Sequence, residues 1–244
     1  MRSTTWTPLA VGSEARRLRR RLWRAVEAQH VVSTLRLVDN AAEQLLLERI
    51  LEANKPPLPP PAARLHYLLS TPFRYPSPFG SRFRAPTEAG VWYGAEHVRT
   101  ACAELGFWRW RFLIDSTGLS ELGPAPQTVF QAGADGRMVD LTQTPFVVDR
   151  DQWTNPADYG ATQQFAAAAR EGGVSAIRYE SVRDPLRGAA VAVLRPETFK
   201  PLRPLKQQSW FLHVKRELVT WQREDEVFEF SYGDSVPAAA GGSR

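Results

Sequence analysis

Apolar residues in the first quarter of the chain recur at the spacing of an amphipathic helix. Leu18, Leu22 and Val26 are four residues apart and stand among arginines, so a helix would gather them on one face. A second helix is predicted to start near Ser33, whose side-chain oxygen can cap an unpaired N–H of the first turn. Its apolar residues on or near one face are Leu35, Val38, Ala42, Leu45 and Ile50. These segments, between residues 13 and 54, predict an N-terminal helical hairpin.

A proline-rich segment ends this helical pattern. Residues 55–61 contain five prolines, each of which lacks a backbone donor and restricts the residue before it to extended conformations. We therefore predict a stiff spacer between the hairpin and the rest of the chain.

Short apolar stretches with strand character follow, interrupted by only two helical patterns. The predicted helices cover residues 96–105 and 158–171, and the second ends at Gly172 and Gly173, which tolerate the closing left-handed conformation. Residues 107–114 alternate aromatic residues with arginines at the period of two that is typical of a half-buried strand. The other predicted strands are residues 65–69, 90–94, 138–141, 146–148, 176–179, 189–194, 210–214 and 227–230. Many short strands with few helices, out of strict alternation, predict an α+β fold.

Size and composition fit a globular protein with an ordinary core. Hydrophobic residues make up 43% and charged residues 23% of the 244 residues, proportions typical of a folded domain. No apolar run is long enough to cross a bilayer, and no signal peptide is recognisable. Cys102 is the only cysteine, so the chain by itself forms neither an internal disulfide nor a thiolate metal site. These features predict a cytoplasmic protein.

Positive charge is concentrated in one short segment. The formal net charge is +5, and the excess comes largely from Arg16, Arg17, Arg19, Arg20, Arg21 and Arg24. A basic segment of this kind usually forms a solvated or partner-binding face. Binding of nucleic acid through this segment stays open as a less favoured alternative.

Motifs of the common nucleotide-binding and hydrolytic enzymes are absent. The sequence has no glycine-rich dinucleotide or phosphate loop, no His-Glu-x-x-His and no Gly-x-Ser-x-Gly. The four histidines lack metal-ligand spacing, so no metal site is expected; they are His30, His66, His97 and His213.

Four spaced residues carry the candidate chemistry. Arg82 stands in a glycine- and proline-rich loop, and Tyr93 ends a predicted strand eleven residues later. Glu104 follows after another eleven residues, in the predicted helix 96–105, and Ser181 comes after a late strand.

This order of residues resembles the RES domain, a bacterial toxin family named for its Arg, Glu and Ser. The Gly-Arg-aromatic segment of that family corresponds to residues 80–83 with one residue inserted, and its Ala-x-x-Glu helix corresponds to residues 101–104. The strand tyrosine and the late serine of the family correspond to Tyr93 and Ser181. The resemblance runs from about residue 65 to residue 199. Arg84 stands where the family often has Asn, which leaves substrate detail open.

The resemblance implies an ADP-ribosyltransferase-like fold and an enzyme that consumes NAD. The nicotinamide–ribose bond would be cleaved by hydrolysis or by phosphate attack, with NAD as substrate and no prosthetic group. Some family members modify proteins, so transfer of ADP-ribose to a protein remains the main alternative. The resemblance also implies an antitoxin partner, usually a small helix-turn-helix protein. The predicted hairpin would contribute to that interface or to self-association into a homo-oligomer.

The residue types suit this chemistry. Glu104 would stabilise an oxocarbenium-like ribose by its charge and by contacts to ribose hydroxyls. Arg82 would hold the diphosphate through its planar fork of donors, and Tyr93 would stack on nicotinamide. Ser181 would hydrogen-bond nicotinamide or ribose, because no base is positioned to make it a nucleophile. Further phosphate contacts would come from Arg74, Arg84 and Arg183.

These patterns together predict a division of the chain into three parts. Residues 1–61 would form the helical region with its linker, and residues 62–200 would form the RES-like catalytic domain. Residues 201–244 would form a C-terminal extension with a disordered tail.

Overall fold

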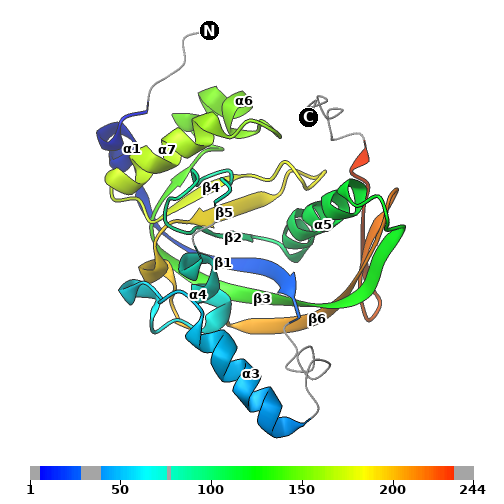
Figure 1. The fold of residues 1–244 in the computed structure, drawn as a ribbon. Coiled ribbons are helices and arrows are strands. Elements are labelled where there is room, and N and C mark those ends of the chain that lie inside the picture. Colours follow the sequence, from blue (N-terminus) through cyan, green and yellow to red (C-terminus); the bar gives the residue numbers. More distant parts are fainter. Residues whose placement is uncertain (1–5, 29–39, 76–77, 234–244) are drawn as a thin grey trace, which may run out of the picture.

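The sheet is built around one long strand, β3 (Glu121–Asp140), in a computed structural model that describes residues 6–28, 40–75 and 78–233 (Figure 1). Eight strands of these residues form a single sheet in the order β1-β2-β5-β4-β3-β6-β7-β8, with a further pairing of β1 to β3. The other strands are β1 (Arg16–Glu27), β2 (Trp92–Ala95), β4 (Ala176–Glu180), β5 (Ala189–Val193), β6 (Lys206–Lys215), β7 (Val219–Arg223) and β8 (Glu226–Phe230).

β3 is long enough to serve three partners. It pairs antiparallel with β1 over residues 127–138 and antiparallel with β6 over residues 121–131. Its last residues, 138–140, pair parallel with β4. Because β1 also touches β2, five strands close into a ring and β6–β8 extend from it. This mixed sheet with flanking helices confirms the predicted α+β class.

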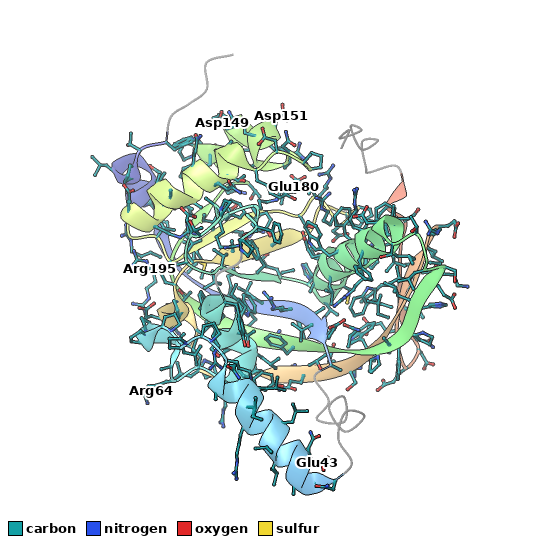
Figure 2. All side chains as sticks on the ribbon, in the orientation of Figure 1. Glu43, Arg64, Asp149, Asp151, Glu180 and Arg195 are labelled. Carbon is teal, nitrogen blue, oxygen red and sulfur yellow. The ribbon has the colours of Figure 1, made fainter. Side chains whose placement is uncertain are left out.

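Helices pack on the sheet at separate places (Figure 1). α5 (Val98–Asp115) lies against β1 and β6, while α1 (Pro8–Glu14) packs on α7 (Gly160–Glu171). α3 (Ala41–Ala53) projects from the body, and Glu43 marks its outer end in Figure 2. The short helices are α4 (Tyr67–Arg74) and α6 (Arg150–Trp153), and 3-10 turns span Pro60–Ala62, Phe146–Asp149 and Pro196–Thr198.

Aromatic residues fill the core on both sides of the sheet. Under α5, Phe107 and Trp110 pack with Tyr232, whose ring lies 5.4 Å and 5.7 Å from theirs. Inside the ring of strands, Trp92 meets Phe199 edge to face at 5.1 Å. Rigid packing of this kind fixes α5 and β2, the two elements that carry Glu104 and Tyr93.

The predicted N-terminal helical hairpin is wrong, because residues 16–27 form strand β1. A spacing of four residues is close to one helical turn of 3.6 residues and is twice the strand period of two, so Leu18, Leu22 and Val26 fit either structure. All three pack in the same cluster as Trp92 inside the ring. Long-range pairing with β3 decided the outcome.

The second predicted helix exists in part, as α3. Asn40 caps it, because its Oδ1 accepts from the backbone N–H of Ala42 at 3.0 Å and of Glu43 at 2.9 Å. Ser33, Leu35 and Val38 lie outside the described residues.

Two predicted strands are helical. Residues 65–69 lead into α4, and residues 107–114 belong to α5. The alternation of aromatic residues at 108, 110 and 112 does not correspond to one buried face. Phe107 and Trp110, three residues apart as on one face of a helix, are buried, while Trp108 is 53% exposed. Short apolar runs are ambiguous between strand and helix, and here the 18-residue length of α5 supports the helix.

The region between α5 and α6 contains more strand than predicted. The long strand β3 begins at Glu121, well before the predicted strand 138–141, and ends at Asp140. The predicted strand 146–148 is wrong, because residues 146–149 form a 3-10 turn. β7 was not predicted. The predicted strands at 90–94, 176–179, 189–194, 210–214 and 227–230 and the helix at 158–171 are confirmed within a few residues.

Strands from all three predicted parts of the chain join the same sheet. β1 comes from residues 1–61 and β6–β8 come from residues 201–244. The division into three parts stays a prediction, and the predicted disordered tail falls mainly on residues 234–244, which lie outside the described residues. No helix in the described ranges is long and apolar enough to span a membrane.

Candidate functional site

A cavity of about 310 Å³ lies where β1, β2 and α5 meet the loop that follows β4. Arg82, Tyr93 and Glu104, three of the four residues singled out in the sequence, line it. The fourth, Ser181, is completely buried directly behind Glu104. Figure 1 shows the loop after β4 running toward α5, which brings the two residues together.

Ser181 holds the carboxylate of Glu104. Its Oγ lies 2.5 Å from Oε1 of Glu104, and it accepts the backbone N–H groups of Arg183 at 3.3 Å and Asp184 at 3.2 Å. A hydroxyl has one hydrogen to donate, so that hydrogen goes to Glu104 and not to a ligand.

Contacts on both sides of Ser181 fix the loop after β4. Oδ2 of Asp184 accepts the hydroxyl of Thr100, in the first turns of α5, at 2.7 Å, and Arg99 pairs with the same carboxylate. Glu180, the last residue of β4, receives two hydrogen bonds from Arg150 of α6 and lies between α6 and α5 in Figure 2. The position of Ser181 is therefore set by contacts on either side.

Burial raises the pKa of Glu104 above its ordinary value. The Ser181 hydroxyl and the positive charges of Arg82 and Arg183 oppose this effect, because they favour the charged form, while Asp184 adds to it. Glu104 is thus a carboxyl group whose charge depends on the serine behind it and the arginines around it.

Arg82 enters the cavity from a tight loop. Only 8% of its surface is exposed, and its Nη1 donates to the carbonyl of Trp153 at 2.8 Å. Its guanidinium lies 4.7 Å from the centre of the Tyr159 ring, a cation–π arrangement. The next residue, Phe83, is fully buried against Tyr179 and anchors the loop.

Tyr93 braces the same loop from β2. Its hydroxyl lies 2.8 Å from Oγ of Ser81 and accepts the backbone N–H of Phe83 at 3.0 Å. Burial raises the pKa of this phenol, so it stays protonated. The ring lines the cavity, while the hydroxyl is already engaged with the Arg82 loop.

Positive charge dominates the cavity wall. Among its lining residues in the described chain, three carry guanidinium groups, Arg24, Arg82 and Arg183, and one carries a carboxylate, Glu104. Arg183 lies 3.7 Å from the centre of the Phe107 ring and donates to the carbonyl of Pro156 at 2.8 Å. A cavity with this balance favours an anionic ligand.

Besides Ser181, two predicted binding residues do not line the cavity. Arg74 donates from Nε to the carbonyl of Pro56 at 2.7 Å. Arg84 is buried, and its Nη2 donates to the carbonyl of Phe79. Arg84 closes the tight turn that presents Arg82, because its backbone bonds Ser81 in both directions.

Several cavity residues were not found from the sequence. Tyr159, Tyr179 and Arg24 line it. Tyr179 stands two residues before Ser181, whereas Tyr159 and Arg24 lie far from the four spaced residues in the chain. Arg24 was visible only as one member of the basic segment. The sequence pattern does not distinguish Arg24 from the neighbouring arginines, because its place at the cavity depends on how β1 pairs with other strands.

Comparison with known proteins adds two findings. The family model described as RES domain matches residues 58–214, a range that contains Arg82, Tyr93, Glu104 and Ser181. A solved structure of the M. tuberculosis MbcT–MbcA toxin–antitoxin complex is similar, with a TM-score of 0.48 and 12% identity, over 82% of this chain and 88% of that chain. No match was found among curated proteins.

Proposed function

The chain belongs to the RES domain family, whose model matches more than half of it, and from this premise we propose that it cleaves NAD at the nicotinamide–ribose bond. The reaction releases nicotinamide and passes the ADP-ribosyl group to water or phosphate. The protein then acts as the toxin of a toxin–antitoxin pair, which kills or arrests cells by removing NAD. NAD is a substrate in this scheme, and no prosthetic group takes part.

One observation carries the proposal: the Glu104 carboxylate, held by Ser181, stands in a cavity whose other charged groups are arginines. NAD brings a diphosphate, which needs cationic donors, and a ribose that becomes cationic as the bond breaks. A fixed carboxylate beside that ribose stabilises the charge as it develops. The same cavity thus offers each part of NAD a group of opposite charge.

The remaining lining residues fit the other parts of the ligand. Arg82, stacked on Tyr159 and tied to Trp153, presents its fork in a fixed orientation, as recognition of a diphosphate requires. The rings of Tyr93 and Tyr159 offer flat surfaces for nicotinamide or adenine. Ser181 acts through Glu104, since its only hydrogen is already donated.

The decisive experiment follows NAD with the purified full-length protein, with and without phosphate, beside Glu104→Gln. We expect the variant to lose on the order of a hundredfold or more in rate, because it keeps the shape but not the charge of the side chain. Glu121→Gln is the matched control, since Glu121 lies on β3 and pairs with His213 away from the cavity. Equal rates for parent and Glu104→Gln would refute the proposal.

The products distinguish the reactions that share this site. Free ADP-ribose indicates hydrolysis, and its 1-phosphate indicates phosphorolysis. With labelled NAD and cell lysate, label retained on protein would indicate an ADP-ribosyltransferase instead.

A further inference from the structure

Two residues of α5, one helical turn apart, bond the loop that follows β4. Glu104 receives the hydroxyl of Ser181 at 2.5 Å, and Thr100 donates its own hydroxyl to Oδ2 of Asp184 at 2.7 Å. Residues four apart in a helix lie on the same face, so both bonds join the same side of α5 to the same loop. The loop is therefore attached to α5 at two points, and only the first uses residues of the family's motif.

The second point of attachment is buried. Thr100 and Asp184 are each only 2% exposed. Oδ1 of Asp184 accepts the backbone N–H of Leu186 at 3.1 Å and also the guanidinium of Arg99. A side chain at Gly188 would collide with the Thr100 hydroxyl, so glycine lets the loop approach α5 this closely. A buried carboxylate with these partners keeps one orientation, because the loss of any of them would leave it unsatisfied.

The backbone of Asp184 connects the two points. Its N–H donates to Oγ of Ser181 at 3.2 Å, and the N–H of Arg183 donates to the same atom at 3.3 Å. These two donors occupy the acceptor side of the hydroxyl, which directs its hydrogen to Glu104. A displacement of Asp184 would therefore change the contact between Ser181 and Glu104.

We infer that Thr100 and Asp184 are positioning residues of the NAD-cleaving reaction, because the bond between them holds Ser181 against the Glu104 carboxylate. The inference rests on the proposed function, which supplies the reaction. Neither residue is among those that line the cavity in the described part of the chain. Their effect on the reaction therefore passes through Ser181 and Glu104.

The pKa of Glu104 reports on this contact. Burial raises it, whereas the hydroxyl of Ser181 and the guanidinium groups of Arg82 and Arg183 lower it. The other titratable groups that interact with Glu104 are Tyr179, Asp184 and Tyr232. Burial raises the pKa of both phenols, so they stay neutral. A weaker contact with Ser181 would raise the pKa of Glu104 and move the acid limb of kcat/KM to higher pH.

The test compares Thr100→Ala with Thr100→Ser, two variants that differ from each other only by the hydroxyl. The rate constant kcat/KM for NAD is measured with the full-length protein across a pH series. We expect Thr100→Ala to be about tenfold slower at neutral pH, with its acid limb at higher pH. Thr100→Ser should stay within about twofold of the parent and keep the parent's acid limb, because it retains the donor.

Thr71→Ala is the matched control. The Thr71 hydroxyl donates to the carbonyl of Tyr67 within α4, and Thr71 does not line the cavity. This variant should therefore behave as the parent does. Thermal unfolding establishes whether each variant is folded.

A second measurement shows whether Thr100 acts through Ser181. Thr100→Ala is combined with Ser181→Ala, and kcat/KM is compared with that of Ser181→Ala alone. Once the Ser181 hydroxyl is absent, its position no longer matters, so the added substitution should cost less than about threefold. A residue with an independent role would cost the same factor in both backgrounds.

Four outcomes would overturn the inference. A Thr100→Ala enzyme as fast as the parent would show that the bond does not contribute. A slower enzyme with an unmoved acid limb, the same loss in the Ser181→Ala background, or a Thr100→Ala protein that does not fold would each assign the bond a purely structural role. All four leave the proposed function intact, whereas a folded parent that does not cleave NAD would overturn that function together with the inference.

Discussion

At the scale of single residues, the Ser181 hydroxyl favours the charged form of Glu104. Burial favours the neutral carboxyl group, and the hydrogen bond from Ser181 favours the carboxylate. The proposed chemistry needs the carboxylate, because only that form opposes the positive charge on ribose. Ser181 is therefore a positioning residue whose effect should appear in the pH dependence of the reaction.

We predict that Ser181→Ala lowers the rate and shifts its pH profile. The pKa of Glu104 is already raised, so activity of the parent falls as the pH drops through that raised pKa. Removing the hydroxyl raises the pKa further, and the acid limb of kcat/KM moves to higher pH. At neutral pH we expect a loss of about tenfold or more, since Glu104 also becomes less fixed.

The measurement is kcat/KM for NAD across a pH series, with Ser116→Ala as control. Ser116 bonds the carbonyl of Phe112 at the exposed end of α5. A slower Ser181→Ala enzyme with an unmoved acid limb would contradict the positioning role.

At the scale of elements, local patterns succeeded where strands are short and bounded by turns. β2, β4 and β5 were predicted because their apolar runs end at glycines or at the Asp-Pro turn after residue 183. β1 and the second half of α5 were not, since a spacing of four residues and an aromatic alternation each fit two structures. The strand structure of β1 is set by its pairing with β3, and the helical structure of α5 by its packing against β6. Both contacts join residues that are far apart in the sequence.

The strand assignment of residues 16–27 gives a stability prediction. Leu22 is fully buried inside the ring of strands, whereas Leu45 on α3 is 57% exposed. Leu22→Ala should cost about 2–5 kcal/mol of unfolding free energy, because it leaves a cavity in packed surroundings. Leu45→Ala should change it by less than about 0.5 kcal/mol.

Urea unfolding of both variants provides the check. A Leu22→Ala cost as small as that of Leu45→Ala would mean that β1 does not belong to the core. For the same reason, deletion of residues 1–54 would remove a strand of the sheet together with any interaction surface.

At the scale of the whole molecule, the arginines of the basic segment have different surroundings. Arg17 and Arg19 share Asp135 and Arg20 pairs with Glu96, whereas Arg24 lines the cavity. Net charge left a nucleic-acid partner open as a less favoured alternative, and the three guanidinium groups of the cavity wall favour an anion inside the cavity. The order of four motif residues pointed to three residues that line the cavity and to the serine behind one of them. The third arginine was not predictable, because it depends on how strands distant in sequence close the ring.

Charge crowding in the cavity predicts how the whole molecule responds to its ligand. The three guanidinium groups around the Glu104 carboxylate repel each other. They belong to β1, to the loop before β2 and to the loop after β4. An anionic ligand should reduce this repulsion and so stabilise the contacts between these segments. ADP-ribose at about a hundred times its Kd should add about 2.7 kcal/mol and raise Tm by about 5–10 °C. Adenosine, which lacks the diphosphate, should raise it far less, and the difference should shrink in high salt. Equal increases in Tm with both ligands would contradict this prediction. They would mean that the aromatic residues of the cavity, and not the arginines, supply the binding energy.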